Sequence, residues 1–251
     1  MKWRHLIIIV LVAAAFFSTA GYAFGNNEND QATLTVAAEP APTLEDRAQF
    51  EQLAAVLYQS TTGSYLLGLR EAYQVTVRFE TGQGSSFNQA ANRILLETNR
   101  SPVSAALLFA HEMNHAQTFH EGRKPHRKSD SRQAYIDQML WDEVKGMAVS
   151  VQVKMELEEN GFDVADVTLP FEDDYRQAYQ VAVEQARLSS SSTSTQQLKA
   201  VGIEAGEQAL YDAYASGQIR TSNTHETYPD YYGRLWDEAN PIWTFVSSLF
   251  S

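Results

Sequence analysis

Hydrophobic residues along the chain recur at two spacings, one typical of helices and one typical of strands. The three-to-four-residue spacing predicts helices at 43–59, 65–73, 102–121, 132–160, 173–188 and 197–215. Alternation over 75–79 and a second apolar run at 93–97 predict two strands of one small sheet. The pattern therefore predicts an α+β fold that is predominantly helical, with the small sheet preceding the helix at 102–121.

The first 23 residues have the pattern of a targeting segment. Lys2 and Arg4 precede an unbroken apolar run at 6–17, which is shorter than the roughly 20 residues that span a bilayer. A small-x-Ala pattern ending at Ala23 predicts cleavage there, with Ala20 as the other option. The sequence thus predicts a signal peptide at 1–23 and an exported protein. An uncleaved, N-terminally membrane-anchored form is the alternative.

The remaining chain divides by its polar stretches. Residues 24–42 show no helical or strand period and predict a flexible linker. Residues 43–188 are expected to form a folded core. A serine-rich stretch then introduces residues 189–251, which we interpret as a C-terminal helical extension that packs on the core.

Composition narrows the chemistry that this chain can perform. It has 251 residues, of which 44% are hydrophobic, so it can bury a substantial core. Because it contains no cysteine, any metal must be bound by histidine and carboxylate side chains. A formal net charge of −12 argues against nucleic acid as a partner, since binding a phosphate backbone needs a positive surface. Nothing in the sequence predicts the oligomeric state.

The candidate chemistry is concentrated in one five-residue motif, His111-Glu112-Met113-Asn114-His115. Residues four apart lie on one helical face, so His111 and His115 can bind the same metal ion. Glu112 points about 100° away and can reach a water on that ion. Metal-assisted hydrolysis requires this geometry, and the motif's place in a predicted helix that follows a predicted strand supports the interpretation.

This motif resembles that of the zincin metallopeptidases, in particular small exported bacterial members. The resemblance covers approximately 75–161 and implies that residues 43–188 form a zincin-like metallopeptidase core. It also implies one Zn²⁺ per chain, with Glu112 as general base, and that the strand at 93–97 binds extended substrate. The metzincin branch is disfavoured, because its Gly and third His are replaced by Thr118 and Glu121. A glutamate-ligand branch remains, in which a later helix completes the site.

Glu143 is the preferred third ligand. It lies 28 residues beyond His115 within an apolar stripe of the predicted long helix, where a carboxylate must be paired or metal-bound. Asp142 competes with it but is rotated by 100° from the stripe. Gly146, one turn on, would allow two helices to approach closely. Weaker suggestions follow for other positions: His120 and His126 as alternative ligands, and Asp137 as the partner that orients a metal-bound histidine.

The sequence therefore predicts an exported zinc metallopeptidase that hydrolyses peptide or protein substrates. Tyr228, Tyr231 and His225 are candidate donors to the oxyanion, although aromatic residues at this density also pack terminal segments against a core. Iron or manganese would fit the same ligand types. The alternative is a non-catalytic exported or envelope binding protein that keeps a structural metal or only the helix. A basic loop at 123–128 could bind an acidic substrate, but a solvated surface is the preferred interpretation.

Overall fold

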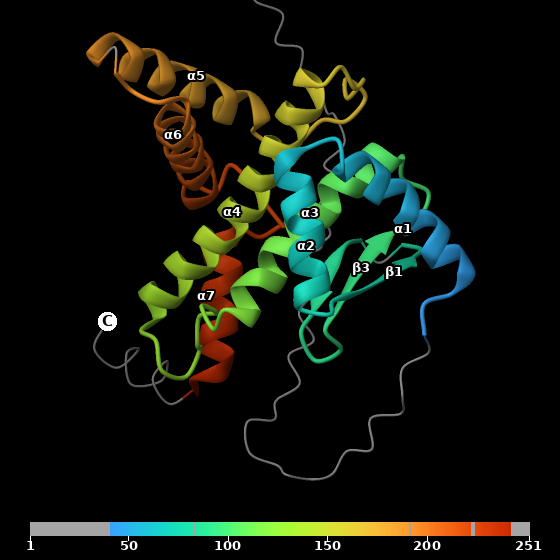
Figure 1. The fold of residues 1–251 in the computed structure, drawn as a ribbon. Helices are drawn as coiled ribbons and strands as arrows, with labels where there is room; N and C mark the ends of the chain where they lie inside the picture. Colours follow the sequence, from blue (N-terminus) through green and yellow to red (C-terminus); the bar gives the residue numbers. More distant parts are fainter. Residues whose placement is uncertain (1–40, 83, 191, 222–223, 242–251) are drawn as a thin grey trace, which may run out of the picture.

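The protein is mainly helical with one small sheet, which confirms the predicted fold class (Figure 1). The structure, a computed structural model, describes residues 41–82, 84–190, 192–221 and 224–241. The predicted signal peptide at 1–23 and most of the predicted linker at 24–42 lie outside these residues. No described helix combines the length and the apolar composition needed to cross a bilayer. The predicted boundary between core and C-terminal extension stays a prediction.

The sheet has three strands, β1 (Thr76–Glu80), β2 (Ser86–Asn88) and β3 (Arg93–Glu97), in the order β1-β3-β2. β3 pairs parallel with β1 and antiparallel with β2, so the two predicted strands do share one sheet. The sequence pattern missed β2, because three residues are too few to show an alternation. β3 is therefore the central strand, paired along its whole length with β1 and over 93–95 with β2. The expectation that 93–97 adds a substrate strand is wrong for 93–95, because both edges of β3 are paired there.

Two helices precede the sheet, α1 (Leu44–Leu57) and α2 (Thr61–Ala72). α1 begins as predicted with a capping box, in which Thr43 and Asp46 bond each other's backbone N–H groups. α2 begins four residues earlier than predicted, because the Ser60 side chain caps it by accepting from the N–H of Gly63.

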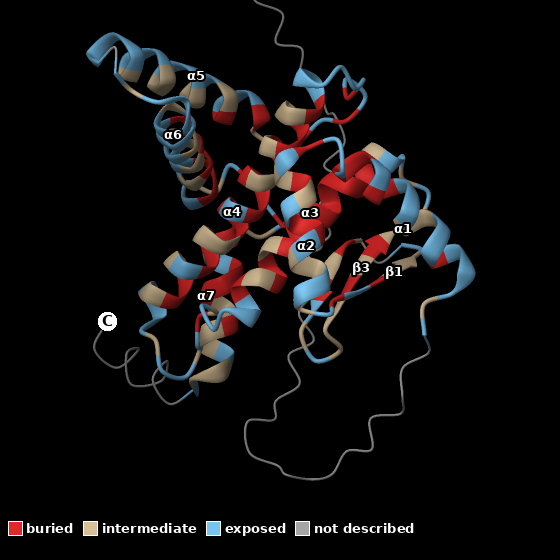
Figure 2. Ribbon diagram, in the orientation of Figure 1, coloured by how far each residue is buried: buried red, intermediate tan, exposed pale blue. Residues whose placement is uncertain are grey.

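The two longest central helices form the middle of the molecule. They are α3 (Pro102–His120) and α4 (Arg132–Glu159), which pack against each other. α3 also packs on the sheet and α4 on α7 (Tyr228–Ala239), and together these elements surround one buried core (Figure 2). Their close approach is visible in one bond between helices, from Ser150 Oγ to the carbonyl of Leu107 at 2.8 Å. The hydrophobic pattern predicts α3 and α4 but no separate helix at α7.

A helical hairpin of α5 (Glu172–Ser189) and α6 (Thr195–Ala215) projects from the side of the molecule opposite the sheet (Figure 1). Its two helices pack closely because the ring of Tyr175 lies on Gly206, where a Cβ atom would come within 2.5 Å of that ring. At its base, the buried Lys154 of α4 donates to Glu172 at 2.7 Å.

Candidate metal centre

Two histidines of α3 and one glutamate of α4 form a buried group that could hold a metal ion. The side-chain ligand atoms of His111, His115 and Glu143 all lie within 4.8 Å of one another. The two Nε2 atoms are 3.0 Å apart, and His111 Nε2 lies 3.5 Å from Glu143 Oε2. The structure thus brings together the three residues that the sequence analysis preferred as metal ligands.

The spacing and the donor types both fit a small divalent ion. Ligands at 2.0–2.1 Å in a tetrahedral site are separated by about 3.3 Å, and two of the three separations, at 3.0 and 3.5 Å, are close to that value, while all three ligand atoms lie within 4.8 Å of one another. Two imidazoles and a carboxylate are a donor set that zinc accepts. All three residues are at most 6% exposed, so their charges need a partner inside the protein.

A glycine makes this arrangement possible. A Cβ atom at Gly146 would lie 2.9 Å from Cε1 and Nδ1 of the His111 ring, closer than side chains tolerate. Gly146 lies one turn beyond Glu143 on α4, so the ring of His111 can rest directly on the helix backbone. The predicted close approach of the two helices at Gly146 is confirmed.

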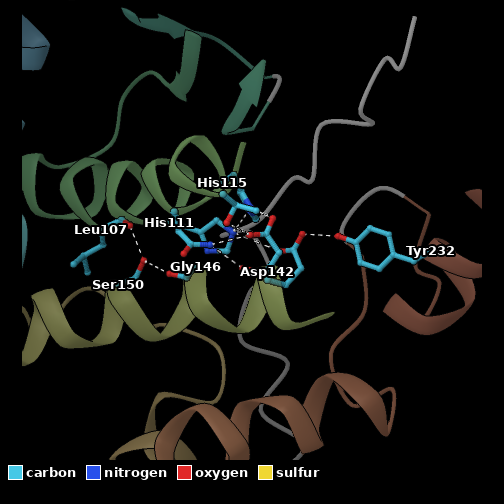
Figure 3. Close-up of polar contacts among 10 residues, drawn as sticks. Leu107, His111, His115, Asp142, Gly146, Ser150 and Tyr232 are labelled. Atoms are coloured by element: carbon cyan, nitrogen blue, oxygen red, sulfur yellow. Dashed lines mark hydrogen bonds and ion pairs between the residues drawn. The ribbon is translucent and has the colours of Figure 1, made fainter. Parts of the chain in front are cut away.

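Asp142 orients His115 and is not a member of the ligand group. Its Oδ2 lies 2.7 Å from His115 Nδ1, which leaves Nε2 of that ring facing His111 (Figure 3). Thr118 and Asn114 donate to its other oxygen, Oδ1. The suggestion that Asp137 orients a histidine is wrong, because Asp137 instead accepts hydrogen bonds from Gln133 and Tyr211.

The protonation of the group reflects its burial and its opposite charges. Burial alone would lower the pKa of His115, but the charge and hydrogen bond of Asp142 raise it to about 10. Burial would likewise raise the pKa of Glu143, yet the hydrogen bond with His111 and the charge of His115 lower it overall. A metal ion would take over the positive charge that protonated His115 supplies, so its binding should release protons.

Glu112 lies beside the group on the neighbouring face of α3. It is 4% exposed, and burial raises the pKa of its carboxyl although the charges of the two histidines oppose this. The backbone N–H of Phe87 in β2 also opposes the rise in this pKa, because it favours the ionised carboxylate. A carboxyl with a raised pKa next to a group that can hold a metal is suited to receive a proton.

The three candidate oxyanion donors occupy different environments. Tyr231 is buried, and its pKa is raised by that burial and by the charge of Glu143, so its hydroxyl remains a donor. Tyr228 is buried with its ring 4.8 Å from that of Tyr214, as in ordinary core packing. His225 is exposed in the turn before α7 and has a positive φ of 56°.

The alternative ligands lie elsewhere on the surface. His120 stacks on Tyr73 with ring centroids 4.5 Å apart, and its Nε2 lies 2.8 Å from Asn92 Oδ1. His126 is exposed in the loop that follows α3, where its backbone N–H donates to Asp130. The structure places neither imidazole in the group that could hold a metal.

Two residues of the basic loop after α3, Lys124 and Arg127, are partly buried rather than fully solvated. Lys124 is only partly exposed, and burial together with the charge of Arg127 lowers its pKa to about 8. Arg127 donates through Nε to the hydroxyl of Tyr135 at 3.2 Å. The solvated interpretation is therefore wrong for these two residues and holds for Arg123 and Lys128, which are exposed.

One residue of the site was missed from the sequence. Tyr232 on α7 donates its hydroxyl to Glu143 Oε1 at 2.5 Å, and the residue is fully buried (Figure 3). It stands next to Tyr231 in the aromatic stretch that the sequence analysis singled out, but nothing in the local pattern selects it. The contact spans 89 positions of the chain, which only the tertiary fold brings together.

No family model, no curated protein and no solved structure matches this chain.

Proposed function

We propose that this protein is an exported zinc-dependent metallopeptidase. The observation that carries the proposal is the buried His111, His115 and Glu143 group with Glu112 beside it. In this proposal the three residues hold the ion, and the Glu between the two histidines favours zinc hydrolysis over iron or manganese chemistry. The resemblance of the motif to the zincins supports the same assignment.

A bound zinc ion would supply Lewis acidity, which lowers the pKa of a water ligand and polarises a carbonyl group. The protein's own residues then do the proton work. Glu112 accepts the proton that the attacking water loses and gives a proton to the nitrogen of the leaving amine. Its raised pKa brings it nearer to neutral pH, where it can do both.

Two further residues have supporting roles. Asp142 holds His115 by its Nδ1 atom and so presents Nε2 to the ion. Tyr231 is the preferred of the three candidate oxyanion donors, because it is buried close enough to Glu143 for that charge to raise its pKa.

Glu112→Gln tests the proposal because it removes the base and keeps the size of the side chain. We expect the zinc-loaded variant to lose hydrolysis of a peptide library by about 10²- to 10⁴-fold while its zinc content stays that of the wild type. Glu159→Gln, at an exposed residue that ends α4, is the matched control and should cleave normally. Hydrolysis that persists in Glu112→Gln would contradict the general-base assignment. A zinc-loaded wild type that cleaves nothing would favour the non-catalytic binding protein.

A further inference from the structure

The two carboxylate oxygens of Glu143 have different partners. Oε1 accepts the hydroxyl of Tyr232 at 2.5 Å, whereas Oε2 lies 3.5 Å from His111 Nε2. A hydroxyl-to-carboxylate bond of about 2.5–2.7 Å is short and charge-assisted, so it is among the stronger hydrogen bonds in proteins. One oxygen is thus engaged by α7, and the other faces the imidazoles of α3.

The hydroxyl of Tyr232 is held in place by its surroundings. Its ring packs against three other tyrosine rings, those of Tyr135, Tyr228 and Tyr231, at centroid distances of 6.5, 6.0 and 5.2 Å. The far end of α7 is fixed as well, because Trp236 donates to the carbonyl of Asp130 in the loop before α4. The position of the hydroxyl is therefore set by packing before any ion binds.

We infer that Tyr232 is a positioning residue of the metal centre, which keeps Glu143 Oε1 engaged so that only Oε2 is offered to the ion. The inference rests on the proposed metal site. A glutamate that binds through one oxygen leaves coordination space for a water, which a catalytic zinc site needs. The inference also makes α7 part of the site, although the resemblance to the zincins ends near residue 161.

The test compares Tyr232→Phe with Tyr135→Phe, each of which removes one buried hydroxyl. Tyr135 is 1% exposed and its ring contacts Tyr232, but its hydroxyl accepts from Arg127 rather than donating to Glu143. We expect Tyr232→Phe to weaken zinc binding by about 10- to 100-fold, measured by chelator competition. Tyr135→Phe should bind zinc like the wild type. The melting temperature of the metal-free proteins shows whether both variants are folded.

The visible absorption spectrum of the cobalt-substituted protein reports the coordination directly. If Tyr232→Phe frees Oε1 to join the ion, the spectrum should become weaker, as expected for a higher coordination number, while that of Tyr135→Phe stays unchanged. Unchanged zinc affinity and an unchanged cobalt spectrum in folded Tyr232→Phe would overturn the inference. Equal losses in both variants would overturn it too, because they would show a general packing effect. Neither readout requires hydrolysis, so a protein that binds zinc but cleaves nothing would contradict only the proposed function.

Discussion

Gly146 shows how much of the candidate site depends on a single missing side chain. The His111 ring lies 2.9 Å from where the Cβ atom of any other residue would be, so the ring and the helix backbone are in direct contact. Small residues at a helix interface generally allow the two helix backbones to approach closely. Here the small residue also sets the position of a candidate metal ligand, His111.

Gly146→Ala should therefore lower the affinity for zinc while the protein still folds. The added methyl group would displace the His111 ring, which lies 2.9 Å away, and we expect at least a tenfold loss of zinc affinity in a competition assay. Gly68→Ala is the matched control, because Gly68 lies in α2 and a Cβ atom there would meet nothing within 4 Å. The control should bind zinc normally and gain about 0.5–1 kcal/mol in free energy of unfolding. Normal zinc affinity in Gly146→Ala would contradict this account of the contact.

Single residues also show what sequence reasoning could and could not find. The spacing within the motif predicts His111, Glu112 and His115 as members of the candidate site, and the apolar stripe predicts Glu143. Both predictions need only the geometry of a single helix. The same geometry set Asp142 aside as a ligand, and that rotation is what directs it to His115 Nδ1. The contact of Asp142 with His115 depends on how α3 lies against α4, and the spacing of residues along one helix cannot predict that.

At the scale of secondary-structure elements, the cap of α1 also secures the sheet. Asp46 completes the capping box with Thr43, and its Oδ1 accepts from the backbone N–H of Phe79 in β1 at 2.8 Å. β1 is an edge strand, so this carboxylate occupies a backbone donor that would otherwise face outward. The sequence predicted the cap, but the contact with β1 depends on tertiary structure.

This contact makes a pH-dependent prediction. Burial would raise the pKa of Asp46, but the hydrogen bonds from Phe79 and Thr43 lower it below its usual 3.8. A lowered pKa means that the folded state favours the ionised carboxylate. The stabilisation is therefore present above pH 3.8 and is lost as the pH falls through the lower pKa of the folded state.

We expect Asp46→Asn to lower the free energy of unfolding by about 1–3 kcal/mol at pH 7, measured by urea unfolding. The difference from the wild type should narrow as the pH falls below 3.8. Asp173→Asn, at an exposed position in the first turn of α5, is the control and should change stability far less. A difference that is constant or grows toward low pH would contradict the assigned role of the carboxylate.

At the scale of the whole molecule, the site is assembled from three helices that are distant in sequence. α3 supplies both histidines, α4 supplies Glu143, and α7 supplies Tyr232, while the α5–α6 hairpin lies between α4 and α7 along the chain (Figure 1). Hydrophobic spacing predicted the fold class and most helices, because those depend on local pattern. It predicted no separate helix at α7, although Thr227 caps that helix and a proline stands in its first turn.

The proposed function depends most on whether the buried group of His111, His115 and Glu143 holds a metal. The most direct measurement is the metal content of the full chain, purified without chelator or histidine tag, by inductively coupled plasma mass spectrometry. We expect one zinc per chain in the wild type and in the surface control Glu159→Ala, and a sharp loss of zinc in Glu143→Ala. Equal zinc in Glu143→Ala, or no metal in the wild type even after reconstitution with zinc, would contradict this expectation.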